Sequence, residues 1–337
     1  MRTDLFDYDL PERFIAQEPV SPRDSSKLLV FDSSTDAVSH EKFRNICKYF
    51  KRGDVLVVNR SKVIPARIIF EHMGKEAEIF VLSSSNDGIV EAMVRPGKIF
   101  SPGAKFDLGS DVTCEVLDVN DEGTRTFKFE GDYMSLGATP LPPYIDNPDV
   151  DPELYQTVYA DEEGSVAAPT AGLHFTPRLL DEIKSMGVKI CEVVLHVGRG
   201  TFTPVKSDDI RDHVMHEEFF VIDEDNCSVL NEAVANGSRI VSVGTTSVRV
   251  LESVFDSSFK PCSGSTDIFI YPGYDWKIVD ALVTNFHLPK STLIMLVSSF
   301  LDSKGVDAPI DKILDLYDLA KSEEYRFYSF GDAMFLF

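Results

Sequence analysis

The chain has 337 residues, of which 43% are hydrophobic and 26% charged, and its 33 basic and 55 acidic residues leave a net charge of −22. This length predicts two domains, and a chain of this size buries a core without needing disulfides or a structural metal. The acidic excess argues against a protein that binds polyanions nonspecifically through a diffuse basic surface, but it is compatible with a local basic groove.

The compartment is indicated by what the sequence lacks. The first residues, Met1–Tyr8, contain no apolar stretch of signal-peptide length, and the longest strongly apolar run, Leu293–Val297, is far shorter than the roughly 18 residues of a membrane span. We therefore expect a cytoplasmic protein with no membrane segment. The cysteines have no C-x-x-C spacing, which favours reduced and mostly buried thiols: Cys47, Cys114, Cys191, Cys227 and Cys262.

The first elements precede the middle of the chain. Phe43, Ile46, Cys47 and Phe50 recur at helical spacing before Gly53, which predicts a helix with a glycine cap. The apolar run 54–58 then predicts a buried strand. This strand would deliver the segment 59–62, Asn-Arg-Ser-Lys, at its carboxyl end.

The middle of the chain reads as short strands separated by turns, with no helix between them. Six such strands predict an antiparallel sandwich or small barrel. They are expected at 66–71, 78–83, 89–95, 104–108, 112–119 and 125–130, and the segment ends at Pro140-Leu-Pro-Pro143, which cannot continue a sheet.

The remainder alternates between helices and strands. Thr176, Pro177 and Gly187 mark the two ends of one helix. Further helices are expected at 226–236, 247–255, 291–301 and 310–323, with strands at 188–197, 239–243 and 278–283. This alternation predicts a mixed α/β main domain, residues 1–62 and 152–337, interrupted by an inserted antiparallel six-stranded β-barrel-like domain, residues 63–151.

Two glycine-containing segments are candidate binding loops. Ala167–Thr176 is a run of small residues that leads into a helix, and both a ligand-binding loop and a plain connection fit it. Leu195–Pro204 presents His196 and Arg199 around Gly198 and Gly200. It is not a dinucleotide fingerprint, because no third glycine and no helix follow.

Two further segments carry charge or hydroxyl groups. Two histidines, His213 and His216, stand beside Glu217 and Glu218, so the segment could bind zinc, move protons or be an exposed acidic stretch. In Val243–Arg249 a buried strand turns into a helix whose hydroxyls and arginine would suit a carboxylate or phosphate, although helix capping also explains the hydroxyls.

The last segment follows two strands near the end of the chain. Asp267 is expected to begin one strand, and Asn285, His287 and Lys290 follow another, at the edge where open α/β sheets bind ligands. The neighbouring Phe269, Tyr271 and Phe286 fit a core better than a stacking platform.

Taken in order along the chain, these motifs resemble the S-adenosylmethionine:tRNA ribosyltransferase-isomerase family of queuosine biosynthesis. The resemblance runs nearly end to end. Its motifs are Phe6–Pro11, Arg23–Leu29, Val63–Arg67, Val94–Lys98, Pro140–Ile145, Tyr155–Ala160, Ala167–Thr176, His196–Phe202, Val243–Glu252, Thr266–Tyr274, Leu282–Val297 and Tyr325–Met334.

The resemblance implies an activity and its partners. The ribosyl unit of S-adenosylmethionine would pass to a 7-aminomethyl-7-deazaguanine at the wobble position of a tRNA and isomerise, giving epoxyqueuosine with release of adenine and methionine. It implies no metal and no cofactor beyond the co-substrate S-adenosylmethionine, because the sulfonium already activates the C5′ hydrogens. A monomer is the simplest expectation. A non-catalytic tRNA-binding descendant of the family and a metal-dependent hydrolase are the alternatives.

The resemblance also implies roles for individual residues, although which one is the general base stays open. Proton transfer or charge stabilisation falls to His174, His196, His216, Glu217, Asp267 and His287. Substrate binding falls to Thr170, Gly172, Gly198, Gly200, Thr245, Thr246, Ser247 and Arg249, and tRNA phosphate binding to Arg60, Lys62, Arg67, Arg95, Lys98 and Lys290.

Two positions depart from the family pattern. Arg60 stands where the family usually has an acidic residue, and Arg199 where it usually has a small one. The basic residues are also unevenly distributed, because residues 40–106 hold 12 basic and 7 acidic residues while 146–163 hold 7 acidic and no basic ones. We therefore expect a local basic cleft on an acidic exterior.

Overall fold

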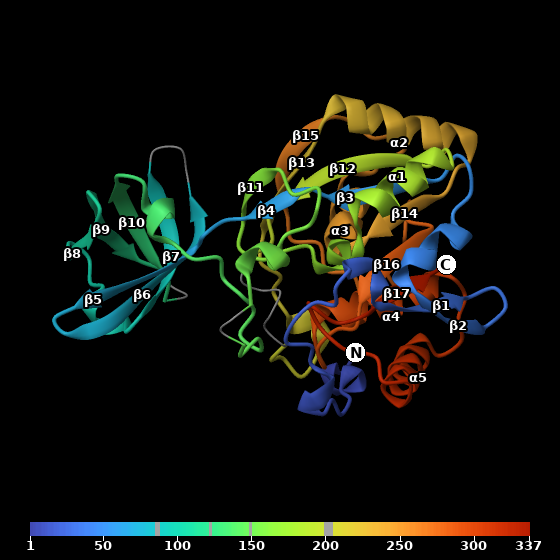
Figure 1. Cartoon of the computed structure of the whole chain (residues 1–337), viewed down its shortest axis with the longest axis horizontal. Coiled ribbons are helices and arrows are strands. Elements are labelled where there is room, and N and C mark those ends of the chain that lie inside the picture. Colours follow the sequence, from blue (N-terminus) through green and yellow to red (C-terminus); the bar gives the residue numbers. More distant parts are fainter. Residues whose placement is uncertain (85–87, 121–122, 148–149, 199–204) are drawn as a thin grey trace.

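The structure is a computed structural model that describes residues 1–84, 88–120, 123–147, 150–198 and 205–337. A main body contains the helices and a large mixed sheet, and an antiparallel barrel-like sheet lies to one side of it (Figure 1). Two segments, one before β5 and one after β10, connect the two parts.

The large sheet has nine strands within the described residues, in the order β15-β13-β12-β3-β14-β16-β17-β1-β2. Its four central strands are parallel to one another: β12 (Lys189–Leu195), β3 (Val55–Asn59), β14 (Ile240–Val243) and β16 (Ala281–Asn285). Strands buried on both faces read as continuous apolar runs, as 55–58 does. Because the four strands are parallel, their carboxyl ends meet at one edge.

The outer strands of the large sheet complete its two sides. Antiparallel pairings join β13 (Glu218–Ile222) to β12 and β15 (Cys262–Thr266) to β13. On the other side, β17 (Ala333–Leu336) lies between β16 and β1 (Lys27–Asp32), which pairs with β2 (Ala37–Lys42). Asp267 follows β15 rather than beginning a strand, so that expectation was wrong.

The helices follow the capping signals of the sequence. Thr176 caps α1 (Pro177–Ser185), Asp223 caps α2 (Glu224–Asn236) and Ser291 caps α4 (Thr292–Ser303). The remaining α-helices are α3 (Gly244–Val254) and α5 (Pro309–Ser322). α3 begins three residues earlier than expected, at Gly244, where φ is 80° and a side chain would be strained.

Short 3-10 helices make up most of the remaining regular structure. The helix expected at 43–50 is one of them. They are η1 (Thr3–Phe6), η2 (Glu12–Phe14), η3 (Arg23–Ser25), η4 (Phe43–Tyr49), η5 (Gly97–Ile99), η6 (Tyr133–Leu136), η7 (Pro152–Tyr155), η8 (Thr170–His174) and η10 (Ile210–Asp212).

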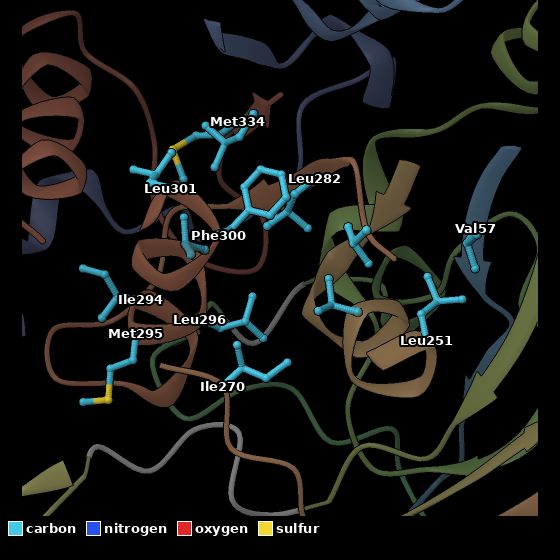
Figure 2. Packing of buried hydrophobic residues seen from close by; sticks show 14 of the residues in the cluster. Val57, Leu251, Ile270, Leu282, Ile294, Met295, Leu296, Phe300, Leu301 and Met334 are labelled. Atoms are coloured by element: carbon cyan, nitrogen blue, oxygen red, sulfur yellow. The ribbon is translucent and has the colours of Figure 1, made fainter. Parts of the chain in front are cut away.

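The hydrophobic core fixes α4 against the sheet. In Figure 2, side chains of α4, among them Leu296, Phe300 and Leu301, lie between Leu282 and Met334 of the sheet and Ile270. These side chains are buried. Ile270 and Leu296 also line a pocket described below, so the same packing positions the pocket wall.

The inserted sheet is antiparallel, with the order β5-β6-β7-β10-β9-β8 in the part of the chain that the structure describes. It confirms the inserted barrel-like fold expected from the sequence. Its edges approach each other through aromatic contacts of Phe70 and His72 on β5 with Phe106 on β8. Its strands are β5 (Arg67–His72), β6 (Lys75–Ser84), β7 (Ile89–Arg95), β8 (Lys105–Gly109), β9 (Val112–Val119) and β10 (Arg125–Glu130).

Two further observations concern cysteines and membranes. The five cysteines are free thiols, and four are buried, as expected, whereas Cys262 is exposed. Among the described residues, the helices are too short or too polar to cross a membrane.

Candidate active site

The carboxyl ends of β3 and β12 are held together by Asn59. Its side-chain amide donates to the carbonyl of Leu195 at 2.9 Å and its oxygen accepts from the Leu195 amide at 3.0 Å and from the Ser61 amide at 3.1 Å. Both side-chain polar atoms of the buried Asn59 therefore have hydrogen-bond partners. These bonds fix the backbone of Leu195, and so they position the segment that follows it, which contains His196 and Gly198.

The small-residue loop lies against the same edge. Val166 donates to the carbonyl of Val197 at 3.1 Å, and the Val197 amide donates to Ser165 Oγ at 2.9 Å. A Cβ on Gly172 would clash with the Tyr159 hydroxyl, and a Cβ on Gly244 would lie 3.5 Å from that of Ala171. The structure thus brings the loop 167–176, the turn at 196–198 and the start of α3 together.

His174 is a buried histidine whose two ring nitrogens already have partners. Nδ1 is 2.8 Å from Ser26 Oγ, Nε2 is 3.3 Å from the amide nitrogen of Asn285, and the ring stacks on Phe43. Burial, with smaller effects from two arginines, lowers the pKa of His174 to about 3. The imidazole is neutral at pH 7 and orients Asn285, which also contacts Thr170 at 3.3 Å.

His287 is held in a similar way at the end of β16. Its Nε2 lies 2.7 Å from Thr284 Oγ1, its amide donates to the Tyr317 hydroxyl at 2.9 Å, and its carbonyl accepts from the Tyr8 hydroxyl. Burial lowers the pKa of His287 to about 3. Fixed in this way, His287 is a neutral hydrogen-bonding group.

A pocket with a charged floor opens beside α3. It is lined by both histidines of the 213–216 segment, by Glu218 and Arg249, and by apolar groups including Phe269 and Leu293. The Arg249 guanidinium forms a buried ion pair with Glu218, and it donates to the carbonyls of Ile268 at 3.3 Å and Thr266 at 3.2 Å. Burial lowers the pKa of Arg249 to about 10, so it stays charged at neutral pH.

Glu218 is the residue of this pocket that sequence reasoning passed over in favour of Glu217. Its second oxygen accepts from the Gly198 amide at 3.0 Å, so one carboxylate links the glycine turn to α3. Glu217 lies just before β13 and is exposed. Glu218 is the first residue of β13, and its side chain is buried. The alternation of the strand Glu218–Ile222 could have identified Glu218.

The three histidines near the pocket differ in their surroundings. His196 is half-buried and stacks on Phe219, and among the residues that the structure describes its buried Nδ1 has no hydrogen-bond partner. Burial lowers its pKa, opposed by Glu162. Burial and neighbouring His216 lower the pKa of His213. His213 and His216 line the pocket, and His196 lies two residues before Gly198.

The hydroxyl residues of the Val243–Arg249 segment lie in different environments. Ser247 is fully buried and donates to the Val243 carbonyl at 2.9 Å within the helix, while Thr245 is also buried. Near the start of α3, Thr246 Oγ1 is buried and has no hydrogen-bond partner in the part of the chain that the structure describes. Asp267 is exposed close enough to Arg249 to favour its charged form.

A second, smaller pocket adjoins the first. Thr170, Asn285 and His287 line it, together with Tyr144, Tyr328 and Leu293. Since Leu293 lines both pockets, the two are neighbours. Thr170 and His287 therefore border a space that adjoins the charged pocket.

Four of the six basic residues expected to contact tRNA have acidic partners. Arg60 pairs with Asp161 and Glu162 at 3.2 and 3.5 Å, and Lys62 pairs with Glu163 at 2.9 Å. These acids lie on or just before β11 (Glu162–Ser165), which pairs with β4 (Ser61–Val63). Part of the acidic segment 146–163 thus faces part of the expected basic cleft.

The other basic residues lie elsewhere. Arg67 pairs with Glu78 at 3.0 Å and Lys290 with Asp7 at 2.7 Å. Arg95 and Lys98 are exposed on the barrel, and within the described residues neither has an ion pair. Gly200 and Arg199 lie outside the described residues.

The histidines and glutamates of the 213–218 segment were one candidate for a zinc site. Over the described ranges, no group of three or more His, Cys, Asp or Glu side chains is placed so that it could hold a metal ion.

Comparisons with known proteins agree along the whole chain. The family model described as "Queuosine biosynthesis protein" matches residues 3–336. The S-adenosylmethionine:tRNA ribosyltransferase-isomerases of Acetivibrio thermocellus and Moorella thermoacetica are each 49% identical, over 347 and 348 residues, with full coverage of both chains. The crystal structure of a Thermotoga maritima S-adenosylmethionine tRNA ribosyltransferase aligns with a TM-score of 0.57 at 38% identity, covering 99% of this chain and 100% of that one.

Proposed function

The chain belongs to the queuosine biosynthesis protein family and is a transferase-isomerase, and from this premise we propose its specific reaction. The enzyme transfers the ribosyl unit of S-adenosylmethionine to 7-aminomethyl-7-deazaguanine at the wobble position of tRNA and isomerises it. The products are epoxyqueuosine-tRNA, adenine and methionine.

The observation that supports this proposal most strongly is the charged pocket at the carboxyl edge of the parallel strands. Open α/β sheets bind ligands at this edge. The pocket combines a buried ion pair, two imidazoles and an apolar wall that includes Phe269 and Leu293. The pocket volume of about 70 Å³ is below the roughly 300–1,000 Å³ of sites that enclose a whole small molecule, so the pocket matches one end of S-adenosylmethionine, the amino-acid zwitterion, and the rest of the ligand extends outside it.

We assign the methionine zwitterion to Arg249 and Glu218. A guanidinium has five N–H donors, and within the described residues three of those of Arg249 are used, one each by Glu218, Ile268 and Thr266. Two remain for the ligand carboxylate. The Glu218 carboxylate lies next to them and suits the α-ammonium of the same ligand. A buried pair of opposite charges thus matches a zwitterion in which the same charges are adjacent.

An imidazole that accepts a proton must be neutral before it reacts. The sulfonium acidifies the C5′ hydrogens, so a nearby imidazole can remove one, and a protonated imidazole can return a proton to departing adenine. Since His174 and His287 are held in buried hydrogen bonds, we assign proton transfer to His213 and His216 as a pair, with His196 as the nearest further imidazole. His174 and His287 then position Asn285 and the end of β16.

Adenine release tests the function directly. The enzyme is incubated with S-adenosylmethionine, with tRNA carrying 7-aminomethyl-7-deazaguanine, with both, or with S-adenosylmethionine and tRNA carrying unmodified guanine, and free adenine is measured by liquid chromatography. We expect adenine only with both substrates and the modified tRNA. Tight binding of the modified tRNA without adenine release would instead identify a non-catalytic tRNA-binding protein.

A further inference from the structure

We propose that the outer face of the barrel holds an unpaired nucleotide of the tRNA loop, beside the one that enters the active site. This inference rests on the proposed function, because it takes tRNA as the acceptor. The site, here called the barrel groove, is formed by Arg67, Glu78, Phe80, Met93, Val94 and Arg95 together with the segment 140–143 and Val166. Its volume is about 410 Å³, within the usual range for sites that hold small organic groups.

The strand register places five of the barrel side chains on one face. Arg67 on β5 is opposite Phe80 on β6, which is opposite Met93 on β7, and Glu78 on β6 is opposite Arg95 on β7. Successive side chains in a strand point to opposite faces. The neighbouring Ile68, Ile79 and Ala92 are buried in the barrel core, so the five groove residues share the outer face. Val94, between Met93 and Arg95, is partly buried against that core and also lines the groove.

The groove combines groups that recognise single-stranded RNA. Phe80 offers an aromatic face, the Arg67 guanidinium lies 5.8 Å from its ring centroid, and Met93 is 38% exposed. Unpaired bases stack on aromatic rings and on arginine planes. Glu78 lies 3.0 Å from Arg67 Nε, and its carboxylate can accept hydrogen bonds from the edge of a stacked base.

The charge of the groove favours a polyanion over a protein segment. Arg95 is exposed and, among the described residues, has no ion pair, in contrast to Arg67 with Glu78. Lys98 is a second exposed cation three residues further along the chain. An uncompensated guanidinium at the rim of an aromatic groove suits the phosphate that accompanies each base.

Two chain segments connect the groove to the active site. Pro143 lines the groove, and the next residue, Tyr144, lines the pocket of Thr170 and Asn285. Likewise Val166 lines the groove and Ala168 lines the same pocket. A nucleotide in the groove would therefore be a close neighbour of a nucleotide in the active site.

The test uses two substitutions with different expected signatures. The probe is an anticodon stem-loop RNA carrying 7-aminomethyl-7-deazaguanine, and its Kd is measured by fluorescence anisotropy at several salt concentrations. Phe80→Leu removes the stacking face and should raise Kd about 10-fold at every salt concentration. Arg95→Ala should also raise Kd and reduce the slope of log Kd against log salt by about 0.7, the value for one phosphate contact on a single strand.

Controls separate this inference from folding and from the proposed function. Lys105→Ala removes one charge from the same barrel, where Lys105 pairs with Glu115 at 3.1 Å, and should leave Kd unchanged. S-adenosylmethionine affinity should be unchanged in all three variants. If the wild-type enzyme releases adenine while Phe80→Leu and Arg95→Ala bind the RNA as tightly as wild type, the groove assignment is wrong and the function stands. Absence of adenine release in the wild type would remove the proposed function itself.

Discussion

Replacing Arg249 by alanine should affect both stability and substrate binding, for reasons visible in the structure. Arg249 and Glu218 form a buried ion pair, with side chains 8% and 6% exposed. Alanine leaves the Glu218 carboxylate buried with the Gly198 amide as its remaining partner among the described residues. Breaking a buried ion pair from one side costs about 3–5 kcal/mol, so the free energy of unfolding should fall by that amount.

A double variant separates binding from folding. Arg249→Met with Glu218→Gln removes both charges at similar volume, and such replacements are often close to neutral for stability. We expect its free energy of unfolding in urea to lie within about 2 kcal/mol of wild type. Its affinity for S-adenosylmethionine should still fall at least about 10-fold, because each lost charge-assisted hydrogen bond contributes about 1.5–3 kcal/mol. Isothermal titration calorimetry measures this affinity.

A matched control lies at the opposite edge of the sheet. Asp54 precedes β3 and pairs with Arg239, which precedes β14, at 2.6 Å. Arg239→Met with Asp54→Asn changes a similar ion pair far from the pocket, so it should leave the affinity for S-adenosylmethionine unchanged. A folded Arg249→Met and Glu218→Gln double variant that binds S-adenosylmethionine as tightly as wild type would refute the zwitterion assignment.

Three further predictions follow from the packing. Burial gives His174 a pKa of about 3 in the folded protein, against about 6.5 in the unfolded chain, so the unfolded chain binds more protons below pH 6.5. The free energy of unfolding therefore decreases as the pH is lowered, by about 2 kcal/mol at pH 5 for this residue. Urea titrations at pH 7.5 and 5.0 should show a smaller pH dependence in His174→Gln, and an unchanged one would contradict its neutral burial; His72→Gln is the control. Gly172→Ala should lower the free energy of unfolding by about 1–3 kcal/mol, because its Cβ meets the Tyr159 hydroxyl, and Tyr159→Phe should recover part of the loss; additive effects would argue against the contact. Cys262 is the exposed thiol and should react first with a thiol reagent in the native state, as mass mapping of the labelled peptide would show; earlier labelling of any of the four buried cysteines would contradict the packing.

The sequence predicted the elements whose signals are local. Thr176, Pro177 and Gly187 mark the helix that the structure places at Pro177–Ser185, and the six barrel strands lie within a few residues of their expected positions. The strand at Lys27–Asp32 was not predicted. It pairs with Ala333–Leu336, about 300 residues away, so its environment is set by tertiary contacts.

The site was harder to predict because partners far apart in the chain decide what each charged residue does. Arg60 and Lys62 looked free in the sequence, but the acids at 161–163 are brought beside them by the pairing of β4 with β11. Glu217 and Glu218 have the same chemistry, and strand alternation alone distinguishes the buried one. His174 resembles a catalytic histidine in sequence, yet its partners Ser26 and Asn285 come from distant segments.

We propose above all that this enzyme adds a ribosyl-derived ring to tRNA. The most direct measurement is mass spectrometry of nucleosides from tRNA carrying 7-aminomethyl-7-deazaguanine after incubation with the enzyme and S-adenosylmethionine labelled with carbon-13 in its ribose. We expect the deazaguanosine nucleoside to gain the labelled epoxycyclopentanediol ring and become epoxyqueuosine. An unchanged nucleoside mass, with a tRNA substrate shown to be accepted by a related enzyme, would contradict the proposal.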